Sequence, residues 1–352
     1  DNVNEIRIVD LKKSGAKPRA LITGLDHEWS YLGNQGTRFL FRTNDGAPLK
    51  KIVAIDVAKA KAEPQSVVAE QKSVIDDAGI VGDKLVVTYL ADARSEAKVF
   101  TLDGAPAAGI ELPGIGTAGG LSGKMGEDEA FFYFTSFNRP TTVYRYDAAS
   151  GAVTPWAAPK VAFSPDDFTV EQRFYNSKDG TKVPMFIVRK QGSIGPAPTL
   201  LYGYGGFDIS LTPAFSAANL AWVDAGGTYV VANIRGGGEY GKAWHDAGRL
   251  KNKQNVFDDF IAAGEYLKAQ GIAAQGGLSI RGGSNGGLLV GAVVNQRPDL
   301  FDAASAAVGV MDMLRFDRWT AGRYWVDDYG HPDKEEDFRV LNAYSPYHNM
   351  KG

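Results

Sequence analysis

The first half of the chain repeats a pattern of short apolar runs at a nearly constant step. In one set each run ends in an aspartate, and successive aspartates are 46, 47 and 44 residues apart. These aspartates are Asp10, Asp56, Asp103 and Asp147. A second set of runs, which begin at Phe39, Leu85 and Phe131, keeps a step of 46 residues. Short apolar runs bounded by Asp, Asn and Gly are typical of β-strands, so each repeat is predicted to hold several antiparallel strands.

A repeat of this length, built from short strands rather than helices, is typical of a β-propeller blade. Residues 1–160 contain three to four such repeats. A propeller needs at least about four blades to close and commonly has more. We therefore expect a partial propeller whose first repeat is entered partway, and hence a chain truncated at its N-terminus. A β-sandwich with accidental spacing is the alternative fold, although both sets of runs keep the step.

The pattern changes near residue 160. Phe163–Asp167 is predicted to be a linker, which divides the chain into domains of residues 1–160 and 161–352. Beyond it, strands and helices alternate, which predicts an α/β domain with a mostly parallel sheet and right-handed crossovers. The predicted strands and helices are Phe174–Asn176, Val183–Arg189, Thr199–Tyr202, Leu220–Ala225, Tyr229–Ile234, Val256–Gln270, Leu278–Arg281 and Leu288–Asn295. The apolar face of one predicted helix comprises Val256, Phe260, Ala263 and Leu267.

Ser284 lies between a predicted strand and a predicted helix. Leu278–Arg281 is the strand, Gly282–Gly287 follows at once, and the apolar helix begins at Leu288. This order around G-x-S-x-G is typical of a nucleophile elbow, where flanking glycines are needed because a Cβ would collide. The N–H of Asn285, at the helix N-terminus, can donate to a developing oxyanion. A glycine-rich phosphate loop is the alternative, but the Lys-Ser/Thr ending of a P-loop is absent from this segment.

Five segments around this serine resemble the prolyl oligopeptidase family of serine peptidases. They are residues 202–207, 232–241, 282–287, 295–301 and 308–313. The resemblance covers essentially the whole chain, and residues 170–352 carry its specific motifs. It implies blades of a seven-bladed β-propeller for residues 1–160 and part of an α/β-hydrolase domain for residues 161–352. Asn285 favours the prolyl branch, because related oligopeptidases that cleave after basic residues usually have alanine after the nucleophile.

The resemblance also implies roles for individual residues. Ser284 would be the nucleophile, and the Tyr204 hydroxyl would share an oxyanion hole with the Asn285 N–H. Trp325 matches the tryptophan that stacks on the substrate proline ring. Other walls of that pocket are matched by Phe207, Val310 and Tyr329. Considered alone, each of these aromatic and apolar residues is also typical of ordinary hydrophobic core.

The proton acceptor that a serine nucleophile requires is not identified in this chain. A histidine must take the serine proton and a carboxylate must orient that histidine, and in this fold both follow the serine, Asp before His. The four histidines do not match the family's catalytic position and are predicted to be structural or surface residues: His27, His245, His331 and His348. We expect the catalytic Asp and His beyond residue 352, a chain truncated at its C-terminus, and poor peptide hydrolysis by the chain alone.

Composition limits the other function classes. The chain is 22% charged and 44% hydrophobic with a formal net charge of −3, which predicts neither a nucleic-acid nor a membrane partner. It has no cysteine, which excludes disulfides and thiolate catalysis. The histidines lack metal-binding spacing and the glycines at 236–238 lack dinucleotide-binding spacing, so no metal and no cofactor are expected. The densest charged run, residues 333–337, is predicted to begin an exposed helix.

The sequence therefore predicts a serine endopeptidase that cleaves short peptides on the carboxyl side of proline through an acyl-enzyme on Ser284. Short proline-containing peptides are the expected partners, a monomer is the expected state, and the cytoplasm is the expected location, with the periplasm as the alternative. Two other functions stay open: an acyl-aminoacyl or dipeptidyl peptidase of the same two-domain plan, and a non-catalytic propeller-based binding protein with an inactive hydrolase domain.

Overall fold

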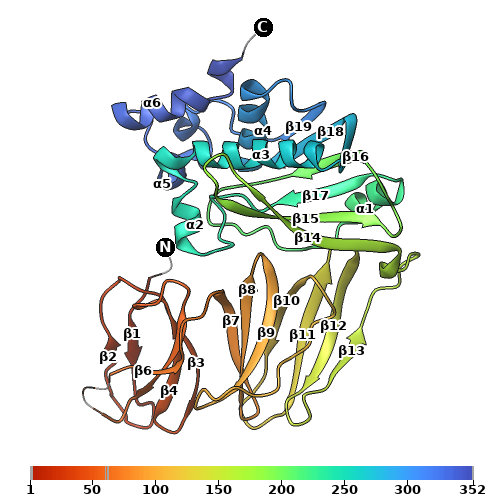
Figure 1. Ribbon diagram of the computed structural model, residues 1–352. Helices are drawn as coiled ribbons and strands as arrows, with labels where there is room; N and C mark the ends of the chain where they lie inside the picture. The colour runs from red at the N-terminus through yellow and green to blue at the C-terminus, as the bar shows by residue number, and fades with distance from the viewer. Residues whose placement is uncertain (1–2, 60, 62, 351–352) are drawn as a thin grey trace. The chain divides into compact units, whose positions relative to one another are not determined.

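The computed structural model describes residues 3–59, 61 and 63–350. The chain divides into two compact units, and each is described by itself. The first comprises Asp1–Phe134 and Thr141–Ala158, and the second comprises Thr135–Pro140 and Pro159–Gly352. Figure 1 shows the strands of the first unit in red to yellow and the strands and helices of the second in green to blue. The domain limits of 1–160 and 161–352 stay a prediction.

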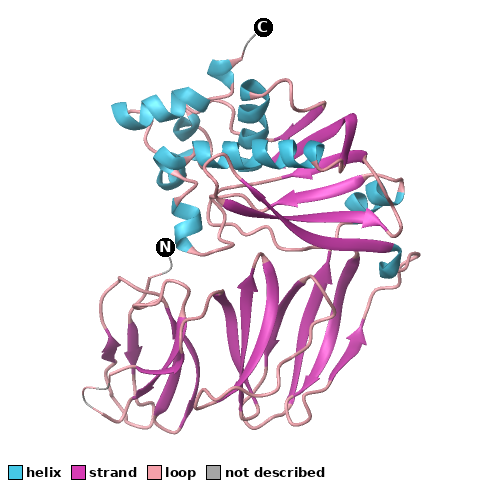
Figure 2. Ribbon diagram, in the orientation of Figure 1, coloured by secondary structure: helices cyan, strands magenta, loops and turns pink. Residues whose placement is uncertain are grey.

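The first unit consists of consecutive strands grouped into small sheets, drawn in magenta in Figure 2. β1 pairs with β2, β3–β6 form a four-stranded sheet, β7–β9 a three-stranded sheet and β10–β13 a four-stranded sheet. Neighbouring strands within them pair antiparallel, as in β3–β4–β5 and β7–β8–β9. These sheets are blades, or parts of blades, of a β-propeller. The strands are β1 Ile6–Ile8, β2 Arg19–Ile22, β3 Trp29–Gln35, β4 Arg38–Thr43, β5 Lys51–Asp56, β6 Gln65–Val68, β7 Val74–Val81, β8 Lys84–Ala91, β9 Arg94–Thr101, β10 Thr117–Ser122, β11 Glu129–Ser136, β12 Arg139–Asp147 and β13 Val153–Ala157.

The predicted repeat coincides with these blades. The second set of apolar runs lies in β4, β8 and β11, each the second strand of its sheet. Asp56 and Asp147 end β5 and β12, and Asp103 follows shortly after β9. Side chains alternate along a strand, and in the hairpin of β11 and β12 Phe132 and Tyr146 are buried in one hydrophobic cluster. The partial propeller is therefore confirmed.

The middle blade has three strands, whereas the sheets before and after it have four. After β9 the chain contacts this sheet through isolated bridges, Ala97 with Ile110 and Phe100 with Pro106. Pro106 has no N–H to donate to a ladder. Gly104, at φ 91°, makes a turn two residues before it. A regular fourth strand therefore does not form here.

The second unit is built on a six-stranded sheet in the order β14-β15-β17-β16-β18-β19. β14–β15 and β15–β17 pair antiparallel, whereas β16–β17, β16–β18 and β18–β19 pair parallel. The predicted α/β fold with a mostly parallel sheet is therefore confirmed. The strands are β14 Phe168–Asn176, β15 Lys182–Lys190, β16 Ala197–Tyr202, β17 Thr228–Ala232, β18 Ala273–Gly283 and β19 Ala303–Ala307. The helices are α1 Ala217–Asp224, α2 Lys242–Asp246, α3 Gln254–Ala269, α4 Asn285–Gln296, α5 Val326–Tyr329 and α6 Glu335–Tyr344.

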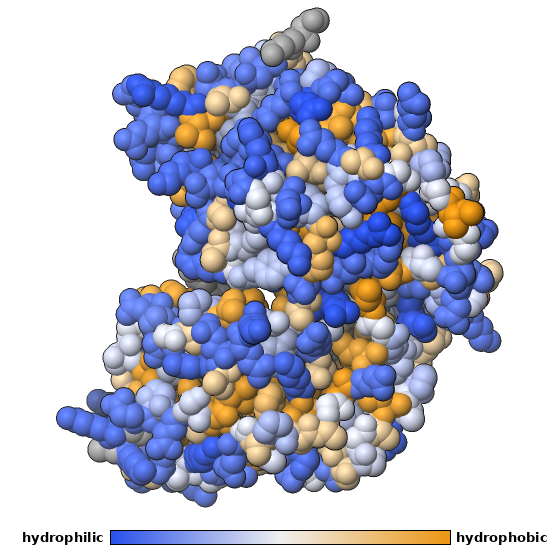
Figure 3. Space-filling model, viewed as in Figure 1, coloured by the Kyte–Doolittle hydropathy of each residue, from blue (hydrophilic) through white to orange (hydrophobic). Residues whose placement is uncertain are grey.

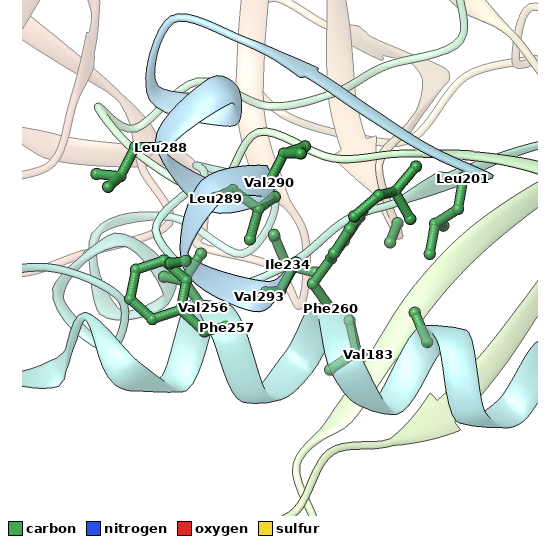
Figure 4. Close-up of a cluster of buried hydrophobic side chains, with 14 of the residues drawn as sticks. Val183, Leu201, Ile234, Val256, Phe257, Phe260, Leu288, Leu289, Val290 and Val293 are labelled. Atoms are coloured by element: carbon green, nitrogen blue, oxygen red, sulfur yellow. The ribbon is translucent and has the colours of Figure 1, made fainter. Parts of the chain in front are cut away.

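Helices cover both faces of this sheet. α1 packs on β15 and β17, where Leu220 lies near Val188. Ile187, the neighbour of Val188, points to the opposite face because side chains alternate, and there it joins the core formed with α3 and α4. Figure 4 shows side chains of α3 and α4, among them Phe260 and Val293, pointing into this core. The predicted apolar face of α3 is confirmed, since its four residues are each 0% exposed.

Several boundaries differ from the prediction. β14 begins at Phe168 rather than Phe174, because buried Phe168 already pairs with Lys190 on β15. The predicted linker contains a 3-10 turn, Pro165–Asp167, in which the side chains of Ser164 and Asp167 accept reciprocal backbone N–H bonds. α2, α5 and β19 were not predicted: α2 and α5 are little more than one helical turn long, and β19 consists of alanine and serine, without the β-branched or aromatic residues that indicate a strand.

The predicted helix start at residues 333–337 is confirmed by α6. Its first turn holds Glu335, Glu336 and Asp337, whose charges are favourable at a helix N-terminus. The surface around α6, at the upper left in Figure 3, is mainly hydrophilic. Among the helices of the described residues, none is long and apolar enough to cross a membrane.

Candidate active site

Ser284 occupies a sharp turn between β18 and α4. Its backbone angles are φ 56° and ψ −117°, and a conformation of this kind costs about 1–3 kcal/mol in a residue with a side chain. The Ser284 N–H donates to the Ala307 carbonyl at 2.9 Å. Its carbonyl accepts the N–H groups of Gly287 and Leu288 in the first turn of α4. The end of β19 and the start of α4 thus hold the serine in a strained elbow.

Two glycines flank the elbow because there is no room for a Cβ. A Cβ on Gly282 would lie 2.1 Å from the carbonyl oxygen of Gly286. A Cβ on Gly286 would lie 2.7 Å from the carbonyl oxygen of Gly203. By contrast, the nearest atom to a Cβ on Gly283 is 3.9 Å away, an ordinary contact. Close backbone approach therefore explains the glycines at 282 and 286.

Tyr204 reaches the same edge of the sheet as Ser284. β16 and β18 are parallel neighbours with Tyr202 opposite Arg281, so the residues that follow both strands emerge together. The Tyr204 phenol interacts with the side chain of Ser284. Burial raises the pKa of the Tyr204 phenol, and the interaction with Ser284 acts in the opposite direction. The phenol is therefore a neutral O–H group at physiological pH.

Three groups hold the side chain of Asn285. Asn285 is 1% exposed, and its Nδ2 donates to the carbonyl of Tyr204 at 2.6 Å. Its Oδ1 accepts from the Tyr329 hydroxyl at 2.8 Å and from Lys253 Nζ at 3.1 Å. Asn285 is also the first residue of α4, and the first N–H groups of a helix have no partner within it. The side chain thus ties the Tyr204 loop to the helix start beside Ser284.

A buried ion pair lies next to Asn285. The Lys253 side chain is 1% exposed, and its Nζ lies 3.7 Å from Asp328 Oδ2. Burial lowers the pKa of Lys253 to about 8, and the charge of Asp328 acts in the opposite direction. Asp328 Oδ1 accepts the Phe207 N–H at 3.1 Å and lies 2.6 Å from His245 Nε2. The network therefore connects the start of α4, the loop after β16, and α5.

Sequence reasoning missed Lys253 and Asp328. One signal was available for Lys253, which directly precedes α3: a positive charge is unfavourable at a helix N-terminus. Asp328 stands in the segment already singled out around Trp325. Lys253 and Asp328 are far apart along the chain, so no pattern in the sequence indicated that they form an ion pair.

Three of the four predicted pocket walls form one aromatic group. The ring centroid of Phe207 lies 6.4 Å from that of Trp325 and 5.4 Å from that of Tyr329, both nearly perpendicular. Phe207 and Trp325 are partly buried, whereas Tyr329 is 1% exposed. Val310 packs against the same hydrophobic core. The Tyr329 hydroxyl also links this aromatic group to Asn285.

Each histidine of the chain contacts another group. The partners are Asp328 for His245, Asp45 for His27 at 3.3 Å, Ser345 for His348 at 2.9 Å, and Asp337 for the backbone N–H of His331. Over residues 3–59, 61 and 63–350, none of these histidine contacts involves Ser284. The structure thus brings Ser284, Tyr204 and Asn285 together, while the four histidines make their contacts with other groups.

A serine on a strained elbow between a parallel strand and a helix defines an α/β hydrolase. Comparison with family models narrows this class. Residues 213–351 match the prolyl oligopeptidase family, and residues 1–159 match the N-terminal β-propeller domain of prolyl oligopeptidase. The chain belongs to the prolyl oligopeptidase family.

Individual relatives agree with this assignment. A prolyl endopeptidase of Elizabethkingia miricola is 44% identical, over 99% of this chain and 50% of its own length. A solved structure from work on two prolyl endopeptidases and their inter-domain dynamics is 56% identical, with a TM-score of 0.86 over 100% of this chain and 52% of its own. Prolyl oligopeptidase B from Galerina marginata, bound to a 25mer macrocyclization substrate, is 34% identical, with a TM-score of 0.90 over 99% of this chain and 50% of its own. The chain thus spans about half the length of these relatives.

Proposed function

We propose that this chain supplies the nucleophile and oxyanion donors of a serine endopeptidase that cleaves short peptides on the carboxyl side of proline. The observation that carries the proposal is the strained elbow of Ser284, with the Tyr204 phenol near its side chain. The substrate class is supported by the prolyl endopeptidases among the relatives. We also propose that the chain forms two domains, residues 1–160 and residues 161–352.

The proposed reaction begins when Ser284 Oγ attacks the scissile carbonyl carbon as its proton passes to a histidine. The carbonyl oxygen then becomes an oxyanion, which accepts hydrogen bonds from the Asn285 N–H and the Tyr204 hydroxyl. Collapse of this intermediate breaks the C–N bond, returns the proton to the leaving amine and leaves an ester on Ser284. Water then hydrolyses the ester by the reverse sequence of proton transfers.

The aromatic group is proposed to bind the ring of the substrate proline. Trp325 offers a flat face, and Phe207 and Tyr329 stand nearly perpendicular to each other beside it. Val310 completes the apolar lining in this proposal. A compact apolar ring matches such a pocket, because burial of its methylene groups contributes roughly 0.8 kcal/mol each.

The histidine and the carboxylate of the triad are proposed to come from outside residues 1–352. Support comes from the four histidines, whose contacts are with other groups. We further propose that the protein acts as a monomer in the cytoplasm, with the periplasm as the alternative. Light scattering of the purified protein and fractionation of cells that express it test these two points.

The central test is covalent labelling of the intact protein by a fluorophosphonate probe, with the modified residue located by mass spectrometry. We expect labelling of Ser284, loss of labelling in Ser284→Ala, and normal labelling in Ser305→Ala, which removes a serine from the exposed strand β19. Absence of probe on Ser284 in the parent protein would support the inactive binding protein instead.

Substrate choice separates the endopeptidase from its enzymatic alternatives. We expect cleavage of a blocked peptide at an internal Pro-X bond. Preferential release of a dipeptide from a free N-terminus, or of a blocked terminal residue, would assign the protein to the dipeptidyl or acyl-aminoacyl peptidases.

A further inference from the structure

Lys253 is buried to a degree that is rare for lysine, and its surroundings are those of the candidate active site. Its side chain is 1% exposed, and lysine is almost never fully buried unless it is paired. It stands between the short 3-10 helix Leu250–Asn252 and α3, three and seven residues before Val256 and Phe260, at the N-terminal end of the apolar face of α3. An ammonium gains nothing from apolar contacts there, so packing of the helix alone does not explain it.

The ammonium of Lys253 contacts three separate segments. Nζ donates to the Gly205 carbonyl at 2.9 Å and to Asn285 Oδ1 at 3.1 Å. It lies 3.7 Å from Asp328 Oδ2 and 5.3 Å from the ring centroid of Tyr329. Gly205 is the neighbour of Tyr204, Asn285 that of Ser284, and Asp328 that of Tyr329. One cation thus connects the loop after β16, the start of α4, and α5.

We propose that Lys253 is a positioning residue that sets the geometry of the oxyanion donors. By holding the Gly205 carbonyl and the Asn285 side chain together, it fixes the Tyr204 hydroxyl relative to the Asn285 N–H. Through Asp328, which accepts the Phe207 N–H, it also anchors the loop that carries the proposed proline pocket. This inference rests on the proposed peptidase function.

The effect is expected on the chemical step more than on substrate binding. An oxyanion donor acts on the charge that develops in the transition state, so a misplaced donor lowers kcat with little change in KM. A misplacement of about 1 Å can cost about 10²-fold in rate. A lysine that only stabilised the fold would instead change the amount of active protein and leave its kinetic constants unchanged.

The variant that tests this is Lys253→Met, which keeps the length of the side chain and removes its donors and charge. In the intact protein we expect kcat for a Pro-X peptide to fall about 10- to 100-fold per active site titrated, with KM within about threefold. The matched control is Lys268→Met on the same helix, whose lysine is 33% exposed and pairs with Asp302. We expect the control to keep both constants within about twofold of the parent.

Loss of the ammonium leaves Asp328 as a buried charge, so Lys253→Met alone could unfold. Lys253→Met with Asp328→Asn removes both charges and keeps an acceptor for the Phe207 N–H. We expect this folded double variant to keep the low kcat. A kcat within about threefold of the parent, in either variant, would overturn the proposal.

A pH series adds a second readout. The charged and titratable groups that face Lys253 are Asp328 and Tyr329, with His245 behind Asp328. The parent should lose part of its kcat as the ammonium deprotonates above about pH 8, and Lys253→Met should lack that decline. An identical alkaline limb in both proteins would count against the inference. Failure of the parent to be labelled at Ser284 would instead reject the proposed function, so the two failures are distinguishable.

Discussion

The proposed role of Tyr204 depends on one atom, the oxygen of its hydroxyl, so a single substitution tests it. Tyr204→Phe deletes the hydroxyl that interacts with Ser284 and keeps the ring. Because one oxyanion donor contributes about 10²–10³-fold in kcat, we expect a loss of that size with a small change in KM, measured by steady-state kinetics on a Pro-X peptide. Tyr202→Phe, two residues earlier on β16, is the control and should behave like the parent. An unchanged kcat in Tyr204→Phe would show that the phenol is not part of the oxyanion hole.

Glu239 gives a prediction about stability against pH. It is 1% exposed, and its Oε1 accepts from the Leu211 N–H and from Asn233 Nδ2. Burial raises the pKa of Glu239 to about 7. A raised carboxyl pKa means that the folded state binds more protons than the unfolded state between about pH 4.5 and pH 7. The free energy of unfolding therefore falls as pH rises through that window.

The variant Glu239→Gln should remove this dependence. At pH 8 we expect it to unfold with a free energy roughly 2–3 kcal/mol higher than that of the parent, and at pH 4.5 with nearly the same value. Denaturant unfolding at the two pH values measures the difference. Glu336→Gln on the exposed face of α6 is the control, and a parent-like pH dependence in Glu239→Gln would show that the Glu239 carboxyl is not the source.

At the scale of an element, the geometry of the elbow predicts that alanine substitutions at two adjacent glycines have very different effects. Gly282→Ala would place a Cβ 2.1 Å from the Gly286 carbonyl oxygen, whereas Gly283→Ala would place one 3.9 Å from its nearest neighbour. We expect Gly282→Ala to displace β18 from α4, to abolish labelling of Ser284 and to lower stability by about 1–3 kcal/mol or more. Gly283→Ala should fold like the parent. Equal labelling of the two variants would contradict the steric account of the elbow.

The predictability of an element depended on its length and on its composition. α3 spans 16 residues, enough for its apolar face to recur through several turns. β19 spans five residues, Ala-Ala-Ser-Ala-Ala, all exposed. Its strand conformation depends on parallel pairing with β18. The middle blade lacks a regular fourth strand because Pro106 interrupts the pairing after β9, a local effect that the repeat did not reveal.

At the scale of the whole molecule, the two units should lose stability separately. Phe132 is 2% exposed and stacks on Tyr144 with ring centroids 5.4 Å apart. Phe132→Ala should destabilise the first unit by about 3–5 kcal/mol. Hydrogen exchange should then accelerate in residues 117–134 and 141–157 and stay unchanged in the α/β sheet. Tyr133→Ala, at a position 42% exposed on the same strand, is the control, and faster exchange throughout would contradict the domain limits near residue 160.

The sequence by itself determined the features whose causes are local. The step of the apolar runs, the face of α3 and the glycines around Ser284 each depend on period or on sterics between near neighbours, and all were predicted from residue order. The family resemblance added Tyr204 and the aromatic residues of the proposed pocket.

Only the tertiary structure decided the electrostatics of the site. The bond from Lys253 to Asn285 joins residues 32 apart, and that from the Phe207 N–H to Asp328 joins residues 121 apart. Whether a lysine at residue 253 is solvated or buried depends on which segments surround it, and burial lowers its pKa and makes the loss of its partner costly. No pattern along the chain encodes that environment, because desolvation is a property of the folded surroundings rather than of the residue.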